Sequence, residues 1–416
     1  MYGFVDAPLM FQLAFLCNLI TDTGAIKSVW DDNFLHWNDG DRQMLAMTAH
    51  VDDLQVGGRK SWRDWVHSVL EKRFGKLKRQ FLPYTHAGIQ IERLPNGTIL
   101  LHQEQFVKAL EPYVISKNRH GDELLSTKEI TTFRSLTCSC LWAGQTRFDE
   151  LCRITTLQQV LREPRVKNLR DINKVIKRLQ APVLRGERLG VFMHKLTSPL
   201  RVVTVSDASS ANKTSNFATE GGLVLLGEDR VSSLDTDAND FLNPDLVMKL
   251  GGKFHNLVTF SQKAKRVSYS TSHAECNAAA RLVPMGSLAA MRYTEPELAI
   301  RLCRTPKAQD LMTIMDGASC PLRHDHVIDC MDLWELCCGY RGIPQDKGQR
   351  LGVLMLREER RSLRLRRLYH VRTLHMLADM LTKCDNPDSK SLLCLVSTGR
   401  WALDGDVRVR HGFSSC

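Results

Sequence analysis

The segment MLAMTAHVDDLQVGG, residues 44–58, joins two short apolar runs through a pair of adjacent carboxylates. The pattern predicts a β-hairpin over residues 44–57, with Asp52 and Asp53 near its tip. Adjacent carboxylates repel each other unless cations hold them, and nucleotidyl transfer uses such a pair to bind two metal ions roughly 4 Å apart. The alternative interpretation of the tetrad from His50 to Asp53 is a solvated Asp-Asp turn.

Helix-like and strand-like patterns surround this hairpin. Residues 9–20 predict a buried helix, and apolar residues at helical spacing predict another over residues 62–74. Strand-like runs on both sides of Asn96-Gly97 predict a second hairpin over residues 86–102. Residues 103–195 then show mainly helical periodicity.

The periodicity changes after residues 182–199, which resemble a linker. Strand-like runs at residues 201–206, 221–227 and 257–261 precede a helix predicted from Ser272 to about Met285. This order predicts a sheet with helices packed against it. From about Ser391 onward we expect a short tail.

Four acidic residues in this half of the chain lie where a carboxylate needs a partner. Asp207 ends a predicted strand, Glu275 shares a helix face with alanines, and Asp379 lies on a second predicted helix. Asp316 follows the apolar run 311–315, which predicts another strand. A carboxylate buried at a sheet is costly unless it is paired or bound to a metal. A surface or capped position is the alternative for each of the four.

His375 is a candidate for an auxiliary role. It precedes Asp379 by four residues, so a continuous helix would bring both side chains to the same side. Such a histidine could assist product release, and the alternative is an ordinary polar helix residue.

Motifs along the chain resemble those of copia-type long-terminal-repeat retrotransposon polymerases. Residues 2–8, YGFVDAP, resemble the LYGLKQAP-type segment, His-Val-Asp-Asp resembles the YVDD box, and residues 86–93 resemble the LGIEIER strand. Residues 133–136 and 146–149 resemble the YRSLVGSL and TRPDI segments. The motifs occur in the family's order, and the resemblance covers nearly the whole chain.

The later half resembles the ribonuclease H domain that follows these polymerases. Residues 206–209, 270–275, 315–319 and 377–383 resemble its VDAS, SSTEAE, CDNxSA and LADIFTK segments. The resemblance implies that Asp207, Glu275, Asp316 and Asp379 are catalytic metal ligands for two Mg²⁺ ions, with Mn²⁺ as a substitute. Magnesium favours such hard oxygen donors. Specificity for an RNA–DNA hybrid would come from the 2′-hydroxyl and the helix shape.

The resemblance also implies a domain order and an α+β or α/β fold class. Residues 1–102 would form a partial reverse transcriptase palm, an antiparallel sheet plus helices, and residues 103–195 a mostly helical thumb and connection. Residues 196–390 would form a ribonuclease H-like mixed sheet with flanking helices, and residues 391–416 a tail.

Polymerase activity is not expected of this chain by itself. In the family, the fingers and a palm strand with another metal-binding Asp precede the segment that Tyr2 begins here. Asp52 and Asp53 are therefore interpreted as remnant metal ligands. Asp6, where the family has Gln, makes the nucleotide-facing segment more acidic.

A basic charge balance favours a polyanionic partner. The 416-residue chain has a formal net charge of +11, and counterion release promotes binding of such chains to nucleic acid. Two segments, 162–188 and 357–372, are rich in Lys and Arg, and a solvated helix face is the alternative for each. The candidate phosphate-facing residues are Arg170, Lys174, Lys177, Arg178, Arg364, Arg366 and Arg367.

The remaining composition argues for an intracellular protein, cytoplasmic or nuclear rather than secreted. The 13 cysteines show no zinc-type spacing, so we expect reduced thiols. Residues 9–20 are too short for a membrane span and lack the basic flank of a signal peptide. No small-molecule cofactor is expected, and other parts of a polyprotein are further candidate partners.

The leading hypothesis is thus a retrotransposon fragment that cleaves RNA in RNA–DNA hybrids. The alternative is an inactive retroelement remnant that binds nucleic acid through its basic surfaces. An unrelated protein with chance motif matches is a third interpretation.

Overall fold

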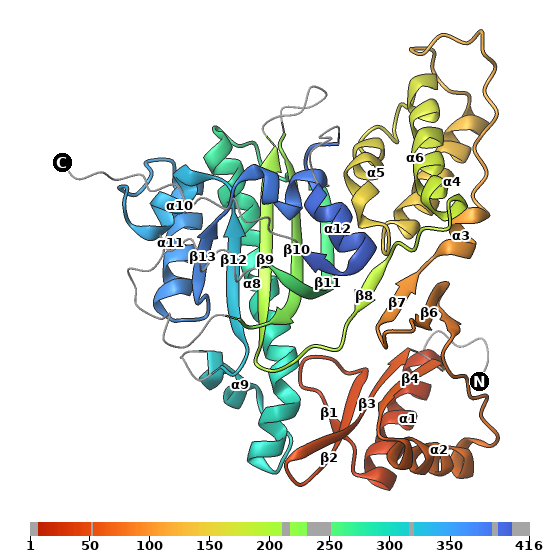
Figure 1. The fold of residues 1–416 in the computed structure, drawn as a ribbon, viewed down its shortest axis with the longest axis vertical. Coiled ribbons are helices and arrows are strands. Elements are labelled where there is room, and N and C mark those ends of the chain that lie inside the picture. Colours follow the sequence, from red (N-terminus) through yellow and green to blue (C-terminus); the bar gives the residue numbers. More distant parts are fainter. Residues whose placement is uncertain are drawn as a thin grey trace. The chain divides into compact units, whose positions relative to one another are not determined.

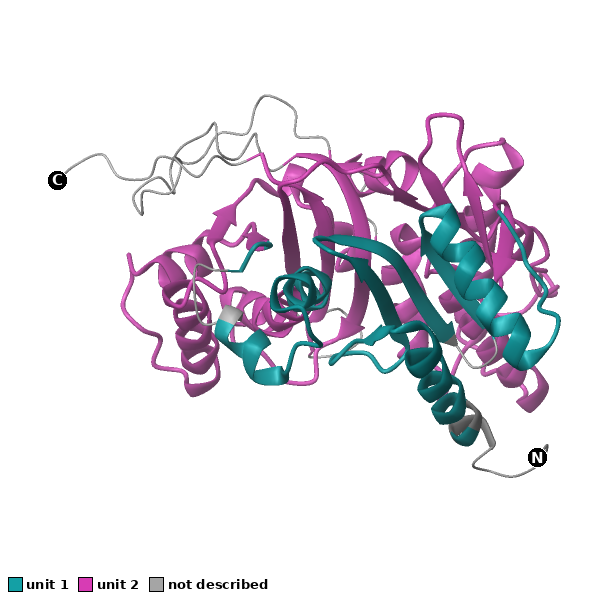
Figure 2. Cartoon of the chain, turned by 90° about the horizontal axis from the view of Figure 1, so that it is seen from below, with its two compact units in different colours: residues 1–81, 289–322 teal, residues 82–288, 323–416 magenta. Residues whose placement is uncertain are grey.

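The computed structural model describes residues 7–50, 53–209, 217–230, 251–315, 320–384 and 390–401. The chain divides into two compact units, which Figure 2 distinguishes by colour. Unit 1 contains residues 1–81 and 289–322, and unit 2 contains residues 82–288 and 323–416. None of the helices in the described ranges is both long enough and apolar enough to cross a bilayer.

Unit 1 contains a four-stranded antiparallel sheet and confirms the hairpin predicted from residues 44–57. The strands follow one another in chain order: β1 (Ile26–Lys27), β2 (Phe34–Asp39), β3 (Arg42–His50) and β4 (Asp53–Gly58). The two predicted helices are α1 (Ala7–Thr23) and α2 (Lys60–Phe74). Leu19, Trp37, Leu45 and Val66 belong to the core that joins these elements.

Unit 2 begins with a second antiparallel sheet of four strands. Its strands are β5 (Tyr84–His86), β6 (Ile89–Arg93), β7 (Ile99–His102) and β8 (Val191–Met193). The predicted hairpin around Asn96-Gly97 is confirmed as β6 and β7. The linker-like segment, in contrast, contains β8, which pairs with β7.

Helices form most of the chain between β7 and β8, as predicted. They are α3 (Glu104–Lys108), α4 (Thr127–Ala143), the 3-10 helix η1 (Phe148–Glu150), α5 (Leu151–Gln158) and α6 (Val166–Leu184). Leu169, Ile172, Val175, Ile176 and Leu179 are buried on one face of α6. This apolar face belongs to a core shared with α4 and α5.

A six-stranded mixed sheet is the centre of unit 2 (Figure 1). Its spatial order is β13 (Arg367–His370), β12 (Arg323–Ile328), β9 (Leu200–Ser209), β10 (Thr219–Glu228), β11 (Gly252–Lys263) and β14 (Arg400–Trp401). The pairs from β9 through β14 are antiparallel, and β12 is parallel to both β9 and β13. The expected class, α+β with a mixed sheet and flanking helices, is therefore confirmed at this coarse level.

Apolar clusters cover the sheet on both sides, so alternate side chains of a strand face one cluster or the other. Val203 and Val205 of β9 pack with the 3-10 helix η5 (Leu377–Leu381) and with α12 (Lys390–Thr398). A separate cluster joins Ile328 to the first part of α8 (Thr271–Leu302), α10 (Met331–Cys338) and α11 (Lys347–Arg361). Because side chains alternate along a strand, Asp207 shares the η5 side with Val203 and Val205.

Three sequence predictions about elements are corrected. Residues 311–315 lie in the helix α9 (Ala308–Met315) rather than in a strand. The predicted tail is wrong for residues 390–401, which form α12 and β14 and bury Leu392, Leu395 and Trp401. The helix predicted from Ser272 begins at Thr271 and runs to Leu302, and the Ser270 hydroxyl accepts the His273 N–H at 3.1 Å.

Two neutral histidines are built into the central sheet. Thr204 Oγ1 lies 2.9 Å from His324 Nε2 and 2.8 Å from His326 Nδ1, and Ser206 Oγ lies 3.1 Å from His326 Nε2. Burial lowers the pKa of His324 to about 4. Burial, reinforced by the charge of His324, lowers the pKa of His326 to about 3.

We predict that these histidines destabilise unit 2 in mild acid. The unfolded chain binds their protons below about pH 6.5, whereas the folded chain does not until about pH 4. Stability is therefore lost as pH falls through this window, by roughly 1.4 kcal/mol per pH unit for each histidine. Denaturant unfolding between pH 7 and 4.5 should show a flatter pH dependence for His324→Gln or His326→Gln than for the wild type. The exposed His120→Gln is the control, and parallel curves for all the proteins would contradict the prediction.

Candidate metal centre

Three carboxylates of unit 2 converge at one end of the six-stranded sheet. They belong to Asp207 in β9, Asp329 directly after β12, and Asp379 in η5. One carboxylate oxygen from each lies within 4.8 Å of the other two. Asp207 and Asp379 are each only 1% exposed, so water screens their repulsion poorly.

The sheet register explains why Asp329 reaches this place. The parallel ladder pairs Val327 of β12 with Val205 of β9. Two residues further along each strand, Asp329 and Asp207 come to the same level. Thr373 Oγ1 donates to Asp329 Oδ2 at 2.9 Å and fixes the carboxylate. Burial, followed by the charge of Asp207, raises the pKa of Asp329 to about 6.

Glu275 approaches the same site from α8. Its Oε1 accepts the backbone N–H of Ala208 at 3.1 Å, which places the carboxylate at the end of β9. Its Oε2 is buried and meets no hydrogen-bond donor within the described part of the chain, but the carboxyl lies within hydrogen-bonding reach of Asp207 when one of the two is protonated. Burial, reinforced by the charges of Asp207 and Asp329, raises the pKa of Glu275 well above its usual value. A buried carboxylate oxygen among like charges needs a proton or a cation to offset its charge.

Two residues that follow η5 contact the carboxylates. The Thr382 hydroxyl donates to Asp207 Oδ2. The Lys383 ammonium forms an ion pair with Asp379 and lies 3.8 Å from Asp207 Oδ2. Burial opposes the charge on Lys383, but Asp207 and Asp379 outweigh it and raise the pKa of this lysine.

A glycine allows η5 to approach the sheet. Gly221 of β10 pairs directly with Asp207. A Cβ atom at residue 221 would lie 2.6 Å from Leu381 Cβ and 2.9 Å from Thr382 Cγ2. The absence of a side chain here therefore lets the segment that carries Asp379, Thr382 and Lys383 lie against β9 and β10.

The structure brings together three of the four predicted nuclease carboxylates: Asp207, Glu275 and Asp379. The fourth, Asp316, lies outside the described residues. The described site contains a further carboxylate, that of Asp329 directly after β12, which the sequence analysis missed. The signal that could have found it is the β-branched pair Val327-Ile328 directly before an Asp.

The hairpin carboxylates of unit 1 do not form such a cluster within the described residues. Asp53 begins β4 and is exposed, whereas Asp52 lies outside the described residues. The interpretation of this pair as remnant polymerase ligands stays a prediction.

His375 does not share a helix with Asp379. It ends the 3-10 helix η4 (Thr373–His375), and the extended residue Met376 separates η4 from η5. His375 is buried, and its carbonyl accepts the Trp401 indole N–H at 3.1 Å. The predicted continuous helix over these residues is therefore wrong, and with it the argument for a shared face.

The basic candidates on α6 differ in exposure. Lys174, Lys177 and Arg178 are exposed, while Arg170 is partly buried and donates to the Arg119 carbonyl at 2.7 Å. Arg178 forms a 2.9 Å ion pair with Glu150. Lys174 likewise pairs with the Asp171 carboxylate at 2.8 Å, and Lys177 is exposed.

Two of the arginines predicted near the C-terminal end face the interior. Arg366 pairs with Asp325 at 2.6 Å and with Asp229 at 2.7 Å. Arg367 is 7% exposed in β13. These contacts correct their assignment to a phosphate-facing surface. Arg364 is partly buried and pairs with Glu359 at 3.0 Å.

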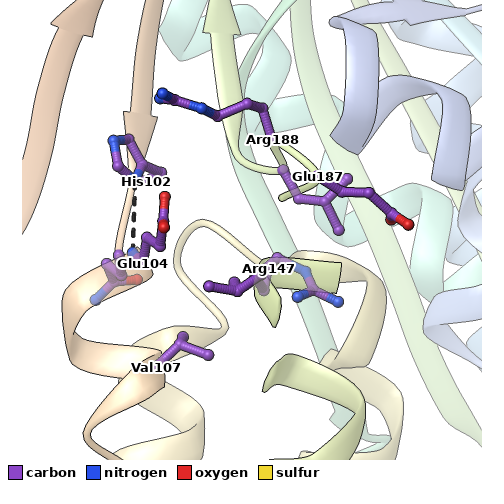
Figure 3. Close-up of a pocket in the computed structure, with 9 residues that line it drawn as sticks. His102, Glu104, Val107, Arg147, Glu187 and Arg188 are labelled. Atoms are coloured by element: carbon purple, nitrogen blue, oxygen red, sulfur yellow. Dashed lines mark hydrogen bonds between the residues drawn. The ribbon is translucent and has the colours of Figure 1, made fainter. Parts of the chain in front are cut away.

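Unit 2 also contains a small pocket near β7 and α3 (Figure 3). Arg147 and Arg188 contribute positive charge to its lining, and Glu104 and Glu187 contribute negative charge. The Glu104 N–H donates to His102 Nδ1 at 3.4 Å. Because opposite charges balance in this lining, its chemistry selects no class of ligand.

Neither a scan against models of known protein families nor a search of curated proteins finds a match to this chain. The geometry of the carboxylates, together with the motif resemblance, therefore carries the functional argument.

We predict that Gly221→Ala destabilises unit 2. Its Cβ would force η5 away from the sheet, and overpacking of this kind costs about 1–3 kcal/mol. Gly342→Ala is the matched control, because a Cβ atom there meets nothing within 4 Å. Denaturant unfolding measures both, and the control should stay within about 0.5 kcal/mol of the wild type. Equal free energies of unfolding for the two variants would contradict the prediction, because they would show that η5 can move away from the sheet without loss of stability.

Proposed function

We propose that unit 2 is a ribonuclease H-like nuclease that uses divalent cations to cleave the RNA strand of RNA–DNA hybrids. The observation that carries the proposal is the convergence of Asp207, Glu275, Asp329 and Asp379 from four separate segments. Each segment is a strand end or a helix on the central sheet. Three of the four residues also match the D-E-D-D motifs of the retroelement domain that the sequence resembles.

The donor set fits hard divalent cations. Among the described residues, the four carboxylates face one ammonium, that of Lys383, so further positive charge is needed when all four are ionised. The Glu275 carboxylate, once ionised, supplies a further oxygen donor at the site. Magnesium prefers such carboxylate ligands, and manganese accepts them as well. When bound, two such ions supply a nucleophilic water and neutralise charge on the leaving 3′ oxygen.

The surrounding residues would hold these donors in place. Thr382 orients Asp207, Thr373 orients Asp329, and the Ala208 N–H orients Glu275. Ligands fixed by such outer contacts lose little freedom when a cation binds. The chain would therefore offer a preoriented set of carboxylates to hold the cations.

The mixed sheet supports the ribonuclease H-like class. Three consecutive antiparallel strands precede α8, and the first of them carries Asp207 at the centre of the sheet. For unit 1 we propose a relationship to a polymerase palm, on the motifs and on its antiparallel hairpin. We do not assign polymerase activity to it.

Cleavage of a labelled RNA–DNA hybrid with Mg²⁺ tests the proposal. Asp207→Asn and Glu275→Gln should each reduce the rate by roughly a hundredfold or more, because each removes a carboxylate from the cation site. Glu111→Gln, which removes an exposed carboxylate outside the site, is the control and should keep the wild-type rate. Hybrid binding without any cutting would instead favour the alternative, an inactive remnant that binds nucleic acid.

A second prediction concerns how the hybrid is held. If α6 contacts the phosphates, Lys174→Gln combined with Lys177→Gln should lower the slope of log affinity against log salt by about two. Binding is measured in EDTA to prevent cleavage, and the exposed Lys117→Gln is the control. An unchanged slope would remove α6 from the proposed interface.

A further inference from the structure

Lys383 reaches the carboxylates through the local structure at the end of η5. The backbone N–H groups of Thr382 and Lys383 both donate to the Asp379 carbonyl, at 3.1 Å and 2.9 Å. This turn folds the chain back, so that the Lys383 ammonium pairs with the side chain of Asp379 four residues earlier. The lysine is 42% exposed, so its amine enters the site from the solvent side.

The ammonium lies where a cation between Asp207 and Asp379 would lie. It pairs with Asp379, lies 3.8 Å from Asp207 Oδ2, and feels the charge of Asp329 as well. These are the three carboxylates whose oxygens come within 4.8 Å of one another. An ammonium and a divalent ion cannot share this space, because both positive charge and volume exclude the second cation.

On the opposite side of the site, the described part of the chain supplies no such internal cation. Glu275 feels the charges of Asp207 and Asp329, and its Oε2 meets no hydrogen-bond donor within the described ranges. The carboxylate set therefore has two unequal sides. Lysine neutralises the Asp379 side, while on the Glu275 side the described residues offer only a proton shared with Asp207, which a divalent ion can displace.

We infer that Lys383 acts as a built-in cation, so that the protein free of nucleic acid takes one divalent ion, beside Glu275, Asp207 and Asp329. The inference rests on the proposed function, because it concerns the same carboxylates. Lys383 is thus a positioning residue that sets cation stoichiometry. A second ion requires the lysine to move aside.

Equilibrium dialysis of the full chain against Mn²⁺ tests this stoichiometry. The wild type should bind one ion, and Lys383→Gln should bind two. Lys383→Arg keeps the positive charge and should bind one. Lys390→Gln removes an exposed lysine outside the site and should also bind one.

A second set of variants tests which carboxylates hold the single ion. In the wild-type background, Asp379→Asn should change Mn²⁺ affinity by less than about threefold, because Lys383 occupies that side. Glu275→Gln should weaken it by more than about tenfold. This comparison needs no Lys383 variant, so it decides the inference even where Lys383→Gln does not fold.

The outcomes separate the inference from the proposed function. A wild type that binds two ions, or equal losses for Asp379→Asn and Glu275→Gln, would overturn the role of Lys383 and leave the nuclease proposal standing. A wild type and a folded Lys383→Gln protein that both bind no Mn²⁺ would overturn both.

Discussion

Repulsion between carboxylates with little water around them is the constraint on which unit 2 depends. Asp207, Glu275 and Asp379 are each at most 2% exposed, and Asp329 lies beside them. Unit charges 4 Å apart in such surroundings interact by about 4 kcal/mol at an effective dielectric constant of 20. Hydrogen bonds from Thr382 and Thr373, and the ammonium of Lys383, offset part of this cost. A fold that keeps such a cluster despite its cost supports a role for the cluster itself.

The rest of the sheet is arranged to make that cluster possible. The parallel register of β9 and β12 brings two strand-end carboxylates to one level. Gly221 admits η5 against the sheet, and the Ser270 hydroxyl accepts an N–H at the start of α8, the helix that carries Glu275. Arg201 and Arg366 pair with the buried Asp325 and so compensate its charge inside the sheet. Backbone geometry, rather than any single side chain, therefore determines where the charges meet.

Local pattern was enough for much of this fold. The hairpins of both small sheets follow from short apolar runs around polar turns, and Asp207 and Glu275 were found because each stands at an expected position on a strand or helix. Asp329 was missed because its strand, Arg323–Ile328, begins with four polar or charged residues. These residues suit a central strand only because of tertiary contacts. His324 and His326 are neutral and lie within hydrogen-bonding distance of Thr204, and Asp325 pairs with Arg366. The apolar run 311–315 caused the opposite error. A strand was predicted where the helix α9 forms, because a short apolar run does not distinguish a strand from a helix.

The final described segment, residues 390–401, has a practical consequence for expression. Trp401 packs with Phe254, and β14 extends the sheet beside β11. The Gly190 N–H donates to the Val396 carbonyl, so this segment also ties down the start of β8. A premature stop codon before Lys390 would expose a wide apolar surface on the sheet, and such surfaces promote aggregation and proteolysis. Shortened versions of this gene product would therefore fail through insolubility before any loss of chemistry could be measured.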